Sequence, residues 1–298
     1  MANKRSRSAS RRGLHPSRRN EIWYRARLLN VVKTARASIE PQLRTFIDAA
    51  IKTDNQDLAQ HIAVTARHMV QKAANEFKMH GKAVAIASAT AMMNLKTVDE
   101  HLIAQVKRVT DVRIQLPKPS ISHADITDTV RLGTGDAQII QFPPTRYGSQ
   151  QKTQSIVKQQ IANNVQLIRS IPDQYFDRLA DDVYENITQA QRWETLADKL
   201  YTTMDYDAQI TRSRANLIAR DQTAKMNSAF NEDRQTSVGI TQYQWQTAGD
   251  ERVRPTHADN DGQIFDWDSP PEVTGHPGHD INCRCVALAM FGELEEAA

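Results

Sequence analysis

The chain has 298 residues and a formal net charge of +3, with 40% hydrophobic and 6% aromatic residues. Its mean hydropathy of −0.59 favours an extended, helix-rich protein with much solvated surface over a compact α/β enzyme. No apolar run approaches the roughly 18 residues that a membrane-spanning helix needs, and no apolar stretch follows the charged N-terminus as it would in a secretory signal. We therefore expect neither a membrane-spanning segment nor a secretory leader.

The first 36 residues carry most of the excess positive charge. They contain eleven Lys or Arg and one acid, whereas residues 37–298 hold 27 basic and 34 acidic side chains. Because residues 1–20 are also rich in Ser and poor in apolar residues, the sequence predicts a disordered basic arm there. Arg pairs its N–H groups with phosphate, so the arm is a candidate for non-specific contact with double-stranded DNA, or for contact with an acidic protein surface. The candidate nucleic-acid-binding residues are Lys4, Arg5, Arg7, Arg11, Arg12, Arg18 and Arg19.

Residues 21–115 show helical periodicity, because apolar residues recur at spacings of three and four. Pro41 is placed as if in the first turn of a new helix, since proline is tolerated there. Two further helices are predicted over 57–79 and 82–109, with Gly81 between them. The four Met residues in this region are expected to fill the core.

Residues 116–154 differ in composition from the helical region before them. Prolines and glycines interrupt short β-like pieces such as 138–142, which predicts a linker or an arm with short strands. This stretch is the best candidate for a domain boundary. Its Gly133-Thr-Gly135 is too short to bind phosphate in the manner of a nucleotide-binding loop.

Residues 155–298 form the second predicted domain. A helix in its first part is expected to end at Pro172, and a long helix is predicted from Ser213 to Phe230. Alternation of apolar and polar residues then predicts a half-buried strand, and the small antiparallel sheet is expected to use 240–248, 263–266 and 284–290. The predicted fold class is mainly α, with an extended helical N-terminal region joined to a C-terminal α+β domain of helices and a small antiparallel sheet.

The C-terminal fifty residues contain the one stretch that reads as a site. Both cysteines of the chain, Cys283 and Cys285, lie here, together with three of the nine histidines. Thiolate and imidazole are the ligands that zinc prefers, so one interpretation is a zinc site of His257, Cys283, Cys285 and His276, with His279 as the alternative to His276. On an extended strand the two sulfurs would lie about 6–7 Å apart, so this interpretation requires a kinked backbone. The other interpretation is two buried, reduced cysteines, because cysteines two positions apart cannot form an unstrained disulfide.

An enzyme is the alternative from another functional class. The polar residues around the same turns could be assembled into a metal-dependent nuclease: His257, Asp259, Asp261, Asp280, Arg252 and Arg254. No spacing forces an acid–base pair together, and no nucleophile motif or phosphate loop is present in the sequence. We therefore expect the chain not to be an enzyme.

Five segments of the second domain together carry a family resemblance: Asn164–Pro172, Ser213–Thr223, Tyr243–Thr247, Asp250–His257 and His276–Cys285. In order and spacing, residues 155–290 resemble the phage Mu F-like family of minor head morphogenesis proteins of tailed bacteriophages. The resemblance implies a virion component present in few copies, made in the bacterial cytoplasm and placed inside the head near the portal vertex. It also implies contact with the portal protein, with major capsid or scaffolding protein, and with packaged DNA. The runner-up is a DNA-binding or DNA-processing protein that acts on the packaged or ejected genome.

Overall fold

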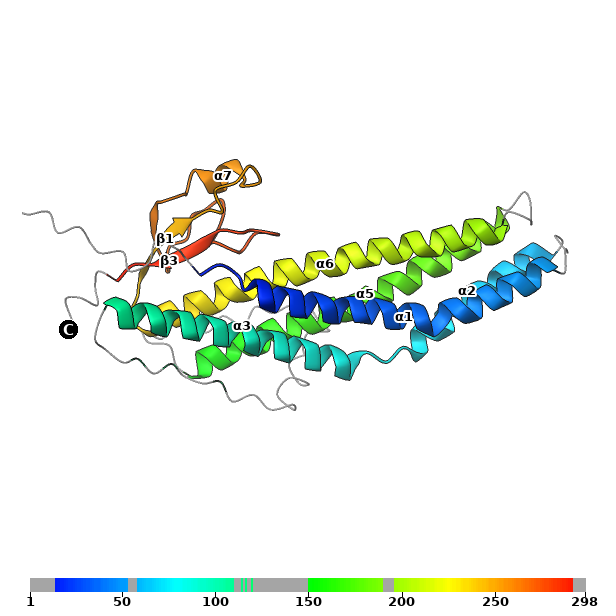
Figure 1. The fold of residues 1–298 in the computed structure, drawn as a ribbon, viewed down its shortest axis with the longest axis horizontal. Helices are drawn as coiled ribbons and strands as arrows, with labels where there is room; N and C mark the ends of the chain where they lie inside the picture. Colours follow the sequence, from blue (N-terminus) through cyan, green and yellow to red (C-terminus); the bar gives the residue numbers. More distant parts are fainter. Residues whose placement is uncertain are drawn as a thin grey trace, which may run out of the picture. The chain divides into compact units, whose positions relative to one another are not determined.

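The computed structural model describes residues 14–52, 58–109, 114, 116, 119, 150–189 and 196–291. Within these ranges the chain is mainly helical, and three short strands near the C-terminus form an antiparallel sheet (Figure 1). This confirms the predicted fold class. The elements are α1 (Arg18–Lys52), α2 (Ala59–Glu76), α3 (His80–Val109), α5 (Gln150–Thr188), α6 (Leu196–Ser237), β1 (Gln242–Gln246), α7 (Pro255–Ala258), β2 (Ile264–Asp266) and β3 (Val286–Ala289).

Two prolines that we expected to mark helix boundaries lie inside helices. Pro41 is within α1, and Pro172 is within α5. Buried aliphatic residues lie close to each proline, including Leu43 two positions after the first and Ile171 directly before the second. A fully buried aliphatic side chain contributes about 1.5–3 kcal/mol, so a few of them offset the roughly 3 kcal/mol that an internal proline costs. Packing on both sides therefore keeps each helix continuous.

The first of two compact units combines residues 23–86 with residues 165–219. Its described elements are all helical, and their apolar faces share one core, which includes Ile39, Leu43 and Leu179. The buried carboxylate of Glu40 accepts hydrogen bonds from Arg36 and from the hydroxyl of Tyr175. Each charge in this buried network therefore has a partner.

The second unit takes its described residues from 1–22, 87–164 and 220–298. Arg234 of α6 is fully buried there, and it donates to Asp99 of α3 at 2.6 Å and to Thr153 of α5 at 2.9 Å. This ion pair ties together the parts of α3, α5 and α6 that belong to the unit. The two units interleave along the sequence, whereas we had predicted consecutive regions over 21–115 and 155–298, because long helices contribute residues to both units.

The predicted linker and arm are only partly within the described residues. Of residues 116–154, the last five belong to α5, and the β-like piece at 138–142 lies outside the described residues. Of residues 1–20, which we predicted to be disordered, residues 14–20 are described. The carbonyl of Leu14 accepts a hydrogen bond from Asn227, and α1 begins at Arg18. The amide of Asn20 donates to Asn94 and so holds this start in place.

The sheet has the strand order β2-β1-β3, and β1 pairs antiparallel with both neighbours. Tyr243 and Trp245 of β1 are fully buried, as the alternating pattern predicts for one face of a strand. In Figure 1 the strands lie beside the yellow C-terminal part of α6. Two side chains of α6 anchor them, since Asn231 donates to the carbonyl of Ala287 and Gln235 accepts from the indole of Trp267. The sheet predicted over 240–248, 263–266 and 284–290 is therefore confirmed, with shorter strands.

Candidate metal centre

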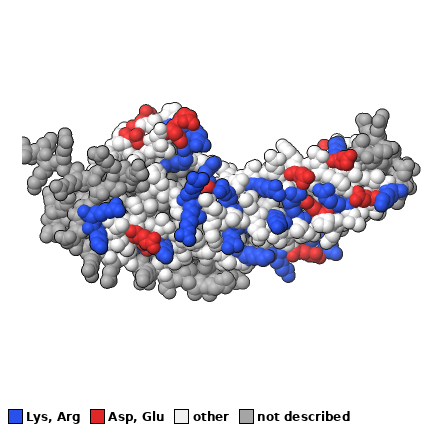
Figure 2. Space-filling view, in the orientation of Figure 1, with Lys and Arg blue, Asp and Glu red and all other residues white. Residues whose placement is uncertain are grey.

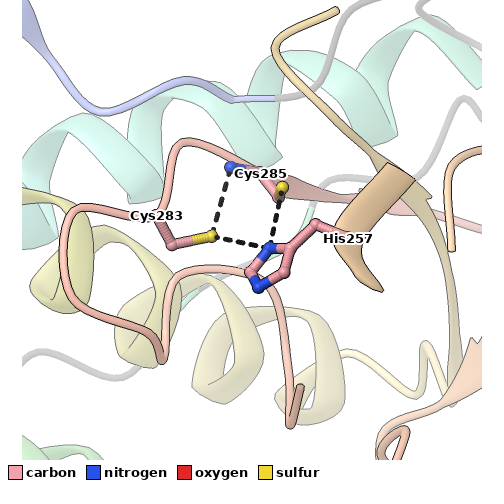
Figure 3. Close-up of side chains that lie close together, drawn as sticks. All are labelled: His257, Cys283 and Cys285. Carbon is pink, nitrogen blue, oxygen red and sulfur yellow. Dashed lines mark hydrogen bonds between the residues drawn. The ribbon is translucent and has the colours of Figure 1, made fainter. Parts of the chain in front are cut away.

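Three metal-binding side chains meet next to the sheet (Figure 3). The Nδ1 of His257 lies 3.4 Å from the Sγ of Cys285 and 3.5 Å from the Sγ of Cys283. All three ligand atoms lie within 4.8 Å of one another, and all three residues are buried. His257 comes from α7, and both cysteines come from the turn that leads into β3.

The imidazole of His257 is held from both sides. Pro255 opens the single turn of α7, where its missing N–H costs nothing, and His257 follows two residues later. Its Nε2 lies 2.8 Å from the Oδ2 of Asp280. Because a carboxylate accepts hydrogen bonds, this contact places the ring proton on Nε2 and leaves Nδ1 as the lone-pair nitrogen facing the sulfurs. Arg254 fixes the same loop by donating to the carbonyl of Ile281 at 2.7 Å.

The cysteine pair sits on a kinked backbone instead of an extended strand. Asn282 has a positive φ of 57°, and Asn accepts this left-handed conformation more readily than most residues do. The middle of α6 anchors the kink, because the N–H of Asn282 donates to Asp221 at 2.8 Å and its side-chain oxygen accepts from Arg220 at 2.9 Å. This geometry meets the requirement that we set for bringing the two sulfurs together.

The electrostatics around Cys283 favour its thiolate. The thiol of Cys285 and the backbone N–H groups of Cys285 and Gly278 donate to the sulfur, and together they hold the pKa of Cys283 well below its usual range despite burial. Hydrogen bonding to Cys283 and burial raise the pKa of Cys285. These hydrogen bonds therefore favour the thiolate at Cys283 and the thiol at Cys285.

His276 and His279 lie apart from this group. The Nδ1 of His276 is 2.9 Å from the hydroxyl of Tyr243, and its ring packs against Trp267 with centroids 5.0 Å apart. Burial, with a smaller contribution from the charge of His279, lowers the pKa of His276 to about 4, so the ring is neutral at pH 7. His279 is exposed to solvent. Among the described residues the structure thus brings together three of the residues in the predicted ligand set, and it places His276 in the aromatic core instead.

The residues of the nuclease alternative are dispersed. Asp261 accepts a hydrogen bond from the backbone of Thr247, which closes the turn before β2. Asp259 is exposed on the same turn. Asp280 contacts His257, and Arg252 and Arg254 line the small cavity beside it, with 3.8 Å between a guanidinium nitrogen of Arg254 and the carboxylate of Asp280. These positions do not form a cluster of carboxylates that could hold a catalytic ion.

Several residues that position the site carry no local signal in the sequence. Asp221 and Arg220 lie about sixty positions before the cysteines, so no local spacing connects them to the kink. Asp250 forms a paired ion contact with Arg284, the residue between the cysteines, and this contact lowers the pKa of Asp250 to about 2. Ser228 of α6 donates to the carbonyl of Pro277 and holds the turn before Cys283.

Of the predicted nucleic-acid contacts, Arg18 and Arg19 lie exposed in the first turn of α1. The other five, Lys4, Arg5, Arg7, Arg11 and Arg12, lie outside the described residues. No helix in the described ranges combines the length and the apolar character that crossing a membrane requires.

Comparison with known proteins finds a similarity in the C-terminal region. Residues 177–288 match the family model described as "Phage Mu protein F like protein", which confirms the resemblance over this segment. The chain is also similar to a protein of Haemophilus influenzae described as uncharacterized, with 29% identity over 99% of this chain. The chain spans 59% of the length of that relative. No solved structure matches the chain.

Proposed function

We propose that this chain is a minor head protein of a tailed bacteriophage, incorporated in few copies inside the head near the portal vertex. The observation that carries the proposal is the Phage Mu protein F-like match over residues 177–288. That segment includes all of α6, the whole sheet except the last residue of β3, and the three residues His257, Cys283 and Cys285. The Haemophilus influenzae protein supports a common architecture beyond this segment, because it also aligns with the helices before it.

The proposed partners are the portal protein, the major capsid or scaffolding protein, and packaged double-stranded DNA. The DNA contact is assigned to the basic arm for reasons of charge. Figure 2 shows Lys and Arg interspersed with Asp and Glu over the described part of the face that it draws, so this face offers no broad surface of one sign. A sequence that concentrates Arg and lacks acids, as residues 1–20 do, neutralises phosphates more effectively than such a mixed surface.

The test is the composition of heads assembled with and without the portal protein. We expect the chain to cosediment with heads that contain the portal and to be lost from heads that lack it. Retention in both kinds of head at equal amounts would contradict the portal association. Absence from both would contradict a role in the head.

We propose a non-catalytic role for the His257 site, although the adjacent Asp280 and Arg254 resemble parts of a DNA-processing centre. One ring nitrogen of His257 is engaged by Asp280, and the other faces the two sulfurs. The ring is buried, and the cavity of about 20 Å³ beside it has room for about one water molecule, which is too little for a nucleic-acid substrate. His257→Ala should act through folding, with soluble yield and head incorporation falling together.

The exposed His279 provides the matched control, and His279→Ala should leave both yield and incorporation unchanged. Cleavage of duplex DNA by the wild type with added divalent metal, abolished in a well-folded His257→Ala variant, would favour the DNA-processing alternative. Cleavage that survives in His257→Ala would exclude this residue as its source.

A further inference from the structure

We propose that His257, Cys283 and Cys285 bind one zinc ion through Nδ1 and the two sulfurs, and that a water molecule supplies the fourth ligand. The inference rests on the geometry of the three side chains and does not depend on the proposed role in the head. It also differs from the four-residue site expected from the sequence, because it uses neither His276 nor His279.

The distances fit a tetrahedral ion. With Zn–S near 2.3 Å and Zn–N near 2.0–2.1 Å, tetrahedral angles place a nitrogen and a sulfur ligand about 3.6 Å apart. The two observed N···S distances are 3.4 Å and 3.5 Å. Zinc bound at the centre of this group therefore requires almost no movement of His257 relative to the sulfurs.

Hydrogen bonds alone account for the contacts less well. Asp280 holds the proton of the imidazole on Nε2, which leaves a single lone pair on Nδ1. The thiol of Cys285 donates to Cys283, so no thiol proton remains for Nδ1, yet both sulfurs approach this nitrogen at similar distances. A dipositive ion bound to all three atoms explains both approaches.

The residues around the ligands support a bound metal. Asp280 contacts Nε2 and orients the imidazole, which is the usual role of a carboxylate behind a zinc-bound histidine. The N–H groups of Gly278 and Cys285 each lie 3.4 Å from the sulfur of Cys283, and such donors stabilise a thiolate ligand. Two thiolates and an imidazole in tetrahedral arrangement select zinc over calcium or magnesium, which prefer oxygen ligands.

We place the fourth ligand in the small cavity beside the three residues. A cavity of about 20 Å³ borders all three residues, and Ala248, Arg252, Arg254 and Asn282 also line it. About 10–15 Å³ is enough for one water molecule. No other His, Cys, Asp or Glu within the described ranges joins the group, and the Nδ1 of His276 is engaged by Tyr243. Water is therefore the ligand that the cavity admits.

Elemental analysis and X-ray absorption at the zinc edge of the full-length purified chain test the proposal. We expect about one zinc per chain, with two sulfur neighbours and two nitrogen or oxygen neighbours. Protein purified without chelator that carries no zinc, and takes up none when zinc is added, would overturn the proposal. A count of fewer than two sulfur neighbours would do the same.

Variants distinguish the three-residue site from the four-residue site. Cys285→Ser should lose the metal, whereas His276→Gln, which keeps a hydrogen-bonding group near Tyr243, and His279→Gln should retain one equivalent. Asp280→Asn should weaken zinc binding about 10–100-fold. Loss of zinc in His279→Gln or in a folded His276→Gln variant would show that the histidine concerned is a ligand and would contradict the open fourth position.

A cobalt measurement covers the case in which Cys285→Ser does not fold. Wild-type protein is stripped with chelator and reconstituted with Co(II) alone. Thiolate-to-cobalt charge-transfer bands and intense tetrahedral d–d bands are expected, and zinc should abolish both. Reconstituted protein without charge-transfer bands would exclude thiolate coordination.

Discussion

Substituting Gly278 by Ala tests how residues 276–285, the segment that leads to the cysteines and is called the metal loop below, pack against α6. Its φ is +92°, and a Cβ built there would lie 2.7 Å from the Cβ of Ser228 and 3.1 Å from its Oγ. Gly278→Ala therefore combines left-handed backbone strain of about 1–2 kcal/mol with overpacking of about 1–3 kcal/mol. We expect the variant to lose about 2–5 kcal/mol of local stability.

Gly262→Ala is the matched control, because Gly262 has a similar φ of +77° and no atom within 4 Å of an added Cβ. It should cost only the backbone strain, about 1–2 kcal/mol. Hydrogen exchange at the amides of β1 and β3 provides the assay, since each 1.4 kcal/mol of lost stability lowers protection about tenfold. Equal loss of protection in the two variants would refute the contact between the metal loop and Ser228.

Three further predictions concern charge and metal. Burial and the charge of Asp182 raise the pKa of Asp207 to about 7, so its stabilising contribution is complete below about pH 4 and is lost as the pH rises through 7. Asp207→Asn should therefore raise the melting temperature at pH 8. The corresponding gain in unfolding free energy is at most about 4 kcal/mol, and an effect that does not depend on pH would contradict this. If zinc is bound, a chelator should lower the stability of the unit that contains the sheet, measured as faster exchange of the β1 amides, and unchanged exchange would argue against a structural ion. Deletion of residues 2–13 removes five basic residues but spares the contact of Leu14 with Asn227. This deletion should reduce the slope of log DNA affinity against log salt concentration by up to about 4–5. An unchanged slope would indicate that the arm binds a protein partner instead of DNA.

Local pattern was sufficient to predict the sheet. The alternation around Tyr243 and Trp245 predicted a strand with one buried face, and the structure confirms both the strand and its two neighbours. Local rules failed at Pro41 and Pro172, because a proline signals a helix boundary only when nothing else holds the helix together. Burial along both helices depends on partners distant in sequence, which a local rule does not include.

For the site of His257, Cys283 and Cys285, too, the sequence predicts what depends on neighbouring residues and misses what depends on distant ones. The sequence placed Cys283, Cys285 and His257 in one candidate zinc site and showed that such a site requires a kinked backbone, but it did not predict the kink itself. Sequence could not distinguish among the histidines, because His276 is equally suitable as a ligand until the position of Tyr243 is known. The anchoring residues Arg220 and Asp221 come from a helix that begins far upstream, so only the folded chain connects them to the site.

The central claim is that this chain is a structural component of a phage head. Quantitative mass spectrometry of purified virions and of empty procapsids, with portal and major capsid proteins as internal references, tests it most directly. The account predicts the chain in both particles, at a few copies per portal and far below the major capsid protein. Abundant chain in the lysate together with its absence from both particles would contradict the account.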